Sequence, residues 1–233
     1  MSEHARWPGQ EAAQALAADA DMLSFLHASE LDAAVLESLR AVGFPANLAL
    51  LPGDAMAREA WRALSAALRE IPVQPDAAAL DELAAEFAAI YLTGAYRLSP
   101  CESYWLDQDH LLYQGPMFEL RQRYAEAGLR VKDWRKRPED HMTHQLGFVA
   151  RLLSAARGEE DWKQLASFLD QHLLRWIHDF ARAVHARTGA SFYAALAVLT
   201  ATWCASLRAC IDVPPMAHAE LAEAHADAND VQH

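Results

Sequence analysis

Apolar side chains recur along most of the chain at intervals of three and four residues. A run of this kind follows Asp76 and extends to Tyr91, and its large apolar residues share one side. This spacing is typical of a helix with one buried face, whereas a half-buried strand would alternate strictly. Helices are expected at 10–27, from 29 or 32 to 39, at 54–71, 76–91, 116–127 and 138–156, from 159 onward, around 176–184 and within 188–207.

Residues that start and stop helices support these boundaries. Asp54 and Asp76 precede two of the apolar runs, where their carboxylates are good N-caps. Pro72 ends the helix before it, and Gly128 ends a later one. The segment 94–107, with its glycine, proline and interleaved aromatics, is expected to be an irregular connection of a length that is often functional.

The composition agrees with an all-α fold. Alanine and leucine are abundant, and there are only 9 glycines and 10 prolines. A chain of 233 residues can bury a sizeable core without a metal or a disulfide. We therefore expect one domain over residues 1–233, an all-α bundle of about nine to eleven helices. Residues 10–213 should be ordered, and 214–233 should form a flexible tail.

The charge balance narrows the class of partner. The chain carries 32 acidic and 20 basic side chains, a net charge of −12. Such a surface repels phosphate backbones, so no nucleic-acid partner is expected, and it attracts basic peptides. Solubility alone is the simpler reason for the charge. The segment 129–137 is a local exception, because it holds five basic residues.

The cysteines and the N-terminus bear on the compartment. Cys101, Cys204 and Cys210 are odd in number and lack CxxC spacing, which indicates ordinary buried thiols in a reducing compartment. Residues 1–11 show no basic region followed by an apolar core, so no export signal is expected. The predicted location is the cytoplasm.

One segment is long enough to be a membrane span. Residues 188–207 contain no charged side chain. However, several serines and threonines make this segment polar for a span, and much of the rest is alanine. A helix buried by its neighbours has the same composition. We expect such a buried helix and no stable membrane insertion.

The short segment Arg137-Pro138-Glu139-Asp140-His141 combines helix-start signals with an acid and an imidazole. Proline suits the first helical position, and the two carboxylates would then complement the positive end of the helix dipole. The segment resembles the Glu-Pro-x-Asp-His signature of the TorD/DmsD/NarJ family of molybdoenzyme maturation chaperones. The family's leading Glu is replaced by Arg137.

Further elements resemble the same family in the same order, so that the likeness covers about residues 80–210. They are Glu86-Phe87-x-x-x-Tyr91-Leu92 running into Gly94, Pro100-Cys101-Glu102-Ser103 with the following Leu106-Asp107 and Leu111-Leu112, Tyr124-x-x-x-Gly128-Leu129, Phe168-Leu169-x-x-His172-Leu173-x-x-Trp176, and Phe192-Tyr193.

The resemblance implies an all-helical domain with two subdomains joined by a hinge, acting as a cytoplasmic chaperone without enzymatic activity or a cofactor. The implied partner is the catalytic subunit of a molybdopterin oxidoreductase. The chaperone would bind its twin-arginine signal peptide, its apo-form or both, assist cofactor insertion and hold back export until folding is complete. The expected state is a monomer or a domain-swapped dimer.

A receptor for such a leader needs carboxylates for the arginines beside an apolar groove. We expect the groove between the connection 94–107 and the N-terminus of the helix 138–156. The candidate residues are Glu86, Tyr91, Leu92, Glu102, Ser103, Tyr104, Trp105, Pro138, Asp140 and His141. Arg137 leaves two possibilities open: the acidic role has moved to Glu139 or Glu102, or this corner does not contact arginine.

Other interpretations compete with this one. His141 and His144 are three apart and would present two imidazoles to a metal, with Asp140 adding a carboxylate, which makes a metal-binding helical bundle the alternative. No second ligand pair, phosphate-binding loop or nucleophile elbow accompanies them, so neither an enzyme nor a metal site is expected. A structural reading makes Asp140 a helix-start residue and Tyr91 part of the core.

Overall fold

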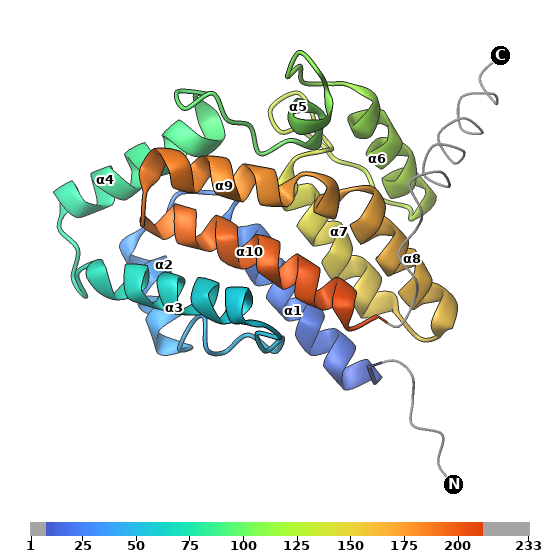
Figure 1. The fold of residues 1–233 in the computed structure, drawn as a ribbon, viewed down its shortest axis with the longest axis horizontal. Coiled ribbons are helices and arrows are strands. Elements are labelled where there is room, and N and C mark those ends of the chain that lie inside the picture. The colour runs from blue at the N-terminus through green and yellow to red at the C-terminus, as the bar shows by residue number, and fades with distance from the viewer. Residues whose placement is uncertain (1–7, 212–233) are drawn as a thin grey trace, which may run out of the picture.

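The computed structural model describes residues 8–211 of the chain, and these form an all-α, single-domain bundle (Figure 1). This confirms the predicted fold class. Besides the α-helices there are a π-helical turn η1 (Ala88–Leu92) and a 3₁₀ turn η2 (Leu173–Arg175). The ten α-helices of the described range are α1 (Gln10–Leu26), α2 (Ala33–Ala41), α3 (Ala55–Glu70), α4 (Ala77–Phe87), α5 (Glu102–Leu106), α6 (Gly115–Glu126), α7 (Met142–Ala155), α8 (Glu159–Gln171), α9 (Ile177–Thr188) and α10 (Phe192–Ala209).

Aspartates start three of the first four helices. The carboxylates of Asp32, Asp54 and Asp76 each accept a hydrogen bond from the backbone amide three residues on, at 2.8 to 2.9 Å. Each bond satisfies one of the amides that a helix N-terminus leaves without a partner, and is worth about 1 kcal/mol. The predicted starts at Asp54 and Asp76 are confirmed, and of the two starts considered for α2 the structure uses Asp32.

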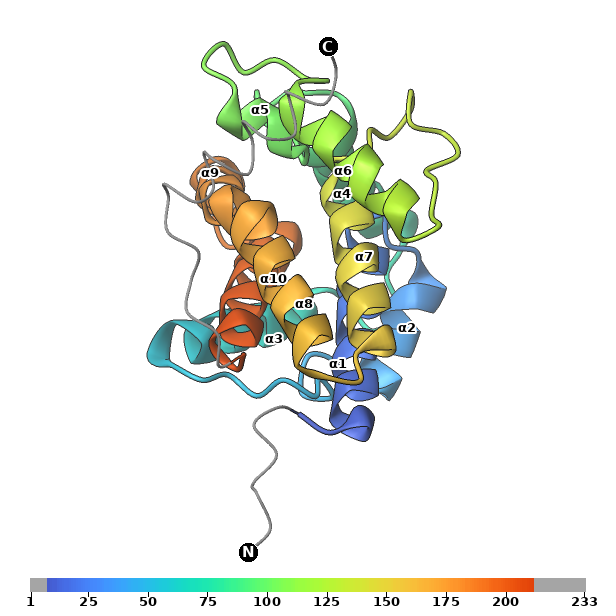
Figure 2. The same ribbon diagram turned by 90° about the vertical axis from the view of Figure 1, so that its right-hand side faces the viewer.

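The helix α10 occupies the middle of the bundle. It packs against α3 on one side and α9 on another, while α1 packs along α7. Figure 2 shows α5 and α6 gathered at one end of the molecule, where α5 contacts both α6 and α9.

Buried polar groups tie α10 to the first helix of the chain. Asp19 of α1 is buried, and one of its carboxylate oxygens accepts a hydrogen bond from the Trp203 indole of α10 at 3.2 Å. The same carboxylate accepts the amides of residues 49 and 50 at 2.9 Å. The hydroxyl of Tyr193 in α10 also accepts the backbone amide of Leu31. Segments about 160 to 180 residues apart are thus joined through groups that water cannot reach.

The helix α10 is also the one helix of the described residues that is long and apolar enough to cross a membrane, and 72% of it is buried inside the protein. Its buried positions go all the way round the helix, which explains why it carries no charged residue before Arg208 in its last turn. This agrees with the predicted buried helix.

Two local predictions are wrong. The connection 94–107 is not irregular throughout, because Glu102–Leu106 form the short helix α5. The next helix does not begin at Pro138: α7 begins at Met142, and the imidazole of His141 caps it by accepting the amide of Thr143.

Pairing between distant segments explains the late start of α7. The amide of Met142 donates to the carbonyl of Pro100 at 2.8 Å, and the amide of Glu102 donates to the carbonyl of Asp140 at 3.0 Å. These two bonds form an isolated antiparallel bridge between Cys101 and His141. A chain paired in this way is extended, so the tertiary contact overrides the local helix-start signals.

The remaining predictions concern the cysteines, the C-terminal tail and the two subdomains. The thiols of Cys101 and Cys204 are buried as predicted, and burial raises the pKa of Cys204 to about 12, but Cys210 is exposed. The predicted flexible tail, residues 214–233, lies outside the described residues. Two subdomains joined by a hinge, within one domain over residues 1–233, stay a prediction.

Candidate functional site

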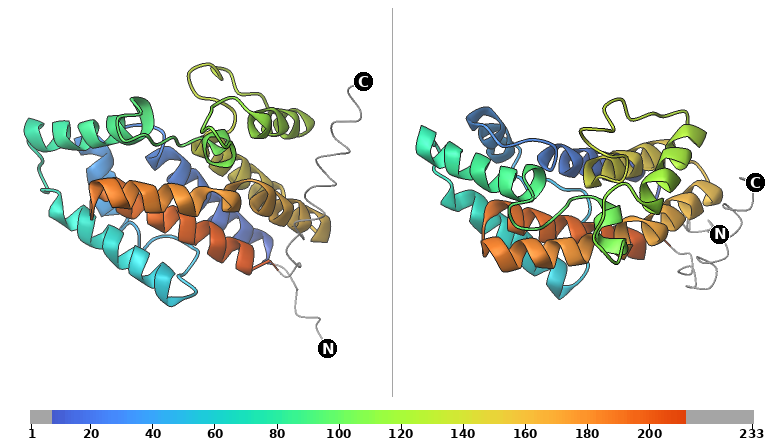
Figure 3. Two further views of the ribbon diagram at one scale, coloured as in Figure 1. Left: turned by 45° about the horizontal axis from the view of Figure 1, so that its top comes forward. Right: turned by 90° about the horizontal axis from the view of Figure 1, so that it is seen from above.

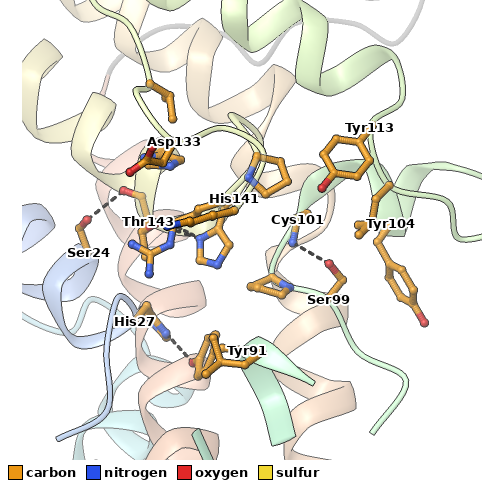
Figure 4. A pocket seen from close by; sticks show the side chains of 18 of the residues that line it. Ser24, His27, Tyr91, Ser99, Cys101, Tyr104, Tyr113, Asp133, His141 and Thr143 are labelled. Atoms are coloured by element: carbon orange, nitrogen blue, oxygen red, sulfur yellow. Dashed lines mark hydrogen bonds between the residues drawn. The ribbon is translucent and has the colours of Figure 1, made fainter. Parts of the chain in front are cut away.

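A cavity of about 1380 Å³ lies between the connection 93–101 and the start of α7, where the groove was expected. Its lining also includes residues from the ends of α1 and α4, from η1, α5 and α6, and from the loops 107–114 and 129–138. Figure 3 shows this loop arching over the N-terminal end of α7, and Figure 4 shows the lining side chains. The sequence brings these segments together through the bridge between Cys101 and His141.

The floor of the cavity is a buried hydrogen-bonded chain. The hydroxyl of Thr200 donates to the carbonyl of Leu196, so it accepts from His27 Nε2, which lies 2.9 Å away. His27 Nδ1 is then the acceptor for the hydroxyl of Tyr91, at 2.6 Å (Figure 4). Both ring nitrogens of His27 and the hydroxyls of Tyr91 and Thr200 therefore have hydrogen-bond partners, as buried polar groups require.

Burial keeps His27 neutral. Its side chain is fully buried, and the loss of hydration lowers its pKa from 6.5 to about 3. Since His27 links Tyr91 in η1 to Thr200 in α10, the imidazole fixes the position of the π-helical turn. The Tyr91 ring also stacks on Phe87 with centroids 4.7 Å apart. Turns of this kind are frequent at functional sites.

One wall of the cavity is cationic. Among the described residues that line it, five are lysines or arginines and one is an acid, Asp133. The five cations are Arg97, Arg130, Lys132, Lys136 and Arg137. The residues that line the cavity therefore carry a net positive charge, opposite in sign to the net charge of −12 on the whole chain.

Three contacts hold the loop that carries most of these cations. The guanidinium of Arg137 donates to the carbonyl of Ala28 at the end of α1, at 2.6 Å. Arg121 of α6 lies over the ring of Trp134, 4.9 Å from its centroid, and pairs with Glu139 at 2.7 Å. The loop is thereby fixed at its middle and at its C-terminal end.

The histidines at the start of α7 are also held neutral. Burial lowers the pKa of His141 well below 6.5, and the neighbouring Arg137 guanidinium adds to the shift. The same two causes lower the pKa of His144. Both imidazoles line the cavity, so they contribute donors and acceptors there and no positive charge.

The rim of the cavity exposes apolar side chains. Leu92, Leu112, Tyr113 and Leu129 all line the cavity and are all exposed, Leu92 to 65%. Leu111 and Phe118 are exposed on neighbouring segments. Exposed apolar groups gathered at a cavity mark a surface that binds another apolar group.

Behind the cavity wall lies a buried polar network. Glu102 accepts a hydrogen bond from Gln145 Nε2 at 3.0 Å and lies 3.1 Å from His172 Nδ1. Asp140 Oδ2 accepts the backbone amide of Ser103 at 2.8 Å. Burial raises the pKa of Asp140 above 3.8, partly offset by its hydrogen bonds to Ser103. The network joins α5 to the start of α7 and the end of α8.

The structure separates the ten candidate residues into two groups. Those that line the cavity are Tyr91, Leu92, Tyr104, Pro138 and His141. Those that do not are Glu86, Glu102, Ser103, Trp105 and Asp140. Glu102, Ser103 and Asp140 belong to the buried network. The indole of Trp105 donates to the carbonyl of Ser99 at 2.8 Å, and Glu86 accepts from the hydroxyl of Ser191.

Several lining residues are not among the sequence candidates. His27 follows directly on the end of α1, and nothing in its local pattern marks it. Leu112, Tyr113 and Leu129 lie in loops, where apolar periodicity gives no signal. The basic segment 129–137 is visible in the sequence, and the structure adds that four of its five cations line a cavity.

Among the described residues, no third side chain joins His141 and His144 as a possible metal ligand. The ring centroids of His141 and His144 are 6.3 Å apart, and the Asp140 carboxylate accepts the backbone amide of Ser103. Within residues 8–211 there is no group of three or more histidine, cysteine, aspartate or glutamate side chains that would hold a metal ion.

The described residues thus form an all-helical bundle around one large cavity with an apolar rim. The model of the family "Nitrate reductase delta subunit" matches residues 52–182. The chain is also similar to three proteins named "Chaperone protein TorD". Identity is 28% with that of Vibrio parahaemolyticus, over 78% of this chain and 87% of the relative. It is 29% with that of Shewanella pealeana (78% and 83%) and 30% with that of Vibrio cholerae strain O395 (82% and 87%).

The chain belongs to the TorD and NarJ family of molybdoenzyme maturation chaperones. The resemblance found in the sequence is confirmed.

Proposed function

We propose that this protein is a cytoplasmic chaperone of a molybdenum-cofactor oxidoreductase. It binds the leader of the immature catalytic subunit, its apo-form or both, assists cofactor insertion and holds back export until the enzyme is folded. It catalyses no covalent reaction. The family, whose relatives are named chaperones, supports the general role.

The observation that carries the proposal is the cavity with its apolar rim. A twin-arginine leader contains an apolar stretch, and exposed Leu92 and Leu129 at the mouth of a large cavity suit such a segment. Burying one leucine side chain contributes about 1.5–3 kcal/mol, so contacts with this rim favour the binding of an apolar segment.

The charges bear on where the two arginines lie. The carboxylates expected to receive them, Glu102 and Asp140, are buried in internal hydrogen bonds, and Glu139 pairs with Arg121. The cavity itself is lined by cations. These contacts favour the possibility that the corner around Arg137 does not contact arginine. The apolar part of the leader then enters the cavity, and the arginines stay outside it.

The test is capture of the client in the native host. Tagged protein, cross-linked in cells, should recover the precursor of a molybdopterin oxidoreductase, identified by mass spectrometry with its leader intact. Deleting the chaperone should lower the amount of active holoenzyme. Leu92→Ser with Leu129→Ser should reduce recovery about tenfold or more, from the loss of apolar burial.

The matched control is Leu51→Ser with Val73→Ser. These residues are 70% and 79% exposed and lie away from the cavity, so recovery should equal wild type. Unchanged holoenzyme in the deletion strain, together with no precursor recovered by the wild-type protein, would refute the proposal.

A further inference from the structure

We propose that the cationic wall of the cavity binds carboxylates, so that the segment taken up from the client is apolar and acidic. This inference rests on the proposed function, because it specifies the chemistry of the ligand at the same site.

The lining cations are free to bind an anion. Arg97, Arg130, Lys132 and Lys136 are exposed, and none of them forms an ion pair with a described residue. They face one mouth from two segments, 93–101 and 129–138. Several like charges around one cavity raise the local concentration of an opposite charge and repel a like one.

The acids near the cavity do not neutralise these cations. Asp133 is the one acid among the described lining residues, and its single negative charge offsets only one of the five positive charges there. Glu139, Asp140 and Glu102 point into the protein, where their hydrogen bonds are internal. A ligand with carboxylates would therefore supply the charge that the wall lacks.

The backbone at the cavity favours a peptide over a phosphate ligand. Phosphate sites at a helix start use free backbone amides. At α7 the first amides are occupied: Met142 donates to Pro100, Thr143 donates to His141 Nδ1, and residues 144 and 145 donate to the His141 carbonyl. The exposed leucines of the rim, in contrast, match an apolar polypeptide.

The wall and the rim lie on the same cavity, so one segment would engage both. An acidic side chain three or four residues from a leucine in a helical ligand shares its face with that leucine. Such a segment would place its apolar residues on Leu92 and Leu129 and its carboxylates near Lys132 and Lys136.

The experiment uses the full chain and three synthetic helical peptides of about 14 residues, about 21 Å long. All are built from leucine and alanine, with glutamate, glutamine or lysine at the same positions on one face. Isothermal titration calorimetry at low and high salt gives the affinities. We expect the order Glu, then Gln, then Lys, and salt should weaken the Glu peptide selectively.

The variant that tests the wall is Lys132→Gln with Lys136→Gln. Removing two exposed charge partners should weaken the Glu peptide about 2- to 30-fold and leave the Gln peptide unchanged. The matched control is Arg135→Gln with Arg151→Gln. It changes the net charge equally, at exposed residues that do not line the cavity, and should bind the Glu peptide as wild type does.

Four results would overturn the inference. The first is a Lys peptide that binds as tightly as the Glu peptide, and the second is a wall variant that behaves like its control. The third is ATP displacing the Glu peptide at concentrations where glutamate does not, which would assign the wall to phosphate. If the Gln peptide and the client still bind in these cases, the proposed function stands, and only its acidic ligand is refuted. Failure of all peptides overturns the inference as well.

Discussion

Lowering the pH should weaken the fold through the histidine at the floor of the cavity. His27 is fully buried, and its pKa in the folded protein is about 3, against 6.5 when exposed. Below about pH 6.5 the unfolded chain binds a proton that the folded chain does not. The contribution of His27 to the free energy of unfolding is therefore fully present above this pH and is lost as the pH drops from about 6.5 toward 3.

The magnitude follows from those two values. Between about pH 7 and pH 5 an imidazole that titrates at 6.5 only when unfolded contributes a loss of about 2 kcal/mol. His141, whose pKa is also lowered well below 6.5, adds a loss in the same direction. Asp140 acts in the opposite direction, because its pKa is raised and the folded protein binds its proton first. A single-residue comparison is needed to separate these contributions.

Urea unfolding of wild type and His27→Gln, followed by circular dichroism at several pH values, provides that comparison. The stability of the variant should be about 2 kcal/mol less sensitive to this change of pH than that of wild type. His110→Gln, at an exposed histidine that also lines the cavity, should keep the wild-type slope. Parallel slopes for wild type and His27→Gln would show that His27 is not held neutral by burial, and the reasoning would be wrong.

Three substitutions test other contacts by urea denaturation. Tyr91→Phe leaves His27 Nδ1 without its donor and should cost about 1–3 kcal/mol, whereas Tyr113→Phe, at an exposed ring, should cost less than about 0.5 kcal/mol; equal losses would contradict this. Gly128→Ala should cost about 1–2 kcal/mol because φ is +72° there, and no loss would contradict the left-handed cap of α6. Asp140→Ala should cost about 1–3 kcal/mol by removing the acceptor of an amide in α5, with Asp140→Asn less damaging; the reverse order would contradict that bond.

The sequence predicted the elements whose formation depends on neighbouring residues. The stripe ending at Tyr91, the caps Asp54 and Asp76, and the buried helix at 188–207 all follow from local spacing and local hydrogen bonds. A cavity also lies where the groove was expected, between two of the motifs that resemble the family, but its role as the binding site stays a prediction.

The parts that sequence reasoning missed depend on contacts between distant residues. The start of α7 moved because Met142 pairs with Pro100, and no local pattern encodes this bond. Glu102 and Asp140 were expected to be acceptors in the groove, yet both are fully buried, where partners on α5 and α7 satisfy them. The apolar rim is built from loops, which have no periodicity to detect.

The bonds from α10 to the first helix have a consequence for biosynthesis. During translation, Asp19 and His27 emerge early, but their partners Trp203 and Thr200 are made more than 170 residues later. At about 5–20 residues per second, the nascent chain waits roughly ten to forty seconds for them. Until then His27, which lines the cavity, lacks its partner in α10, so the cavity reaches its final form only when translation is nearly complete.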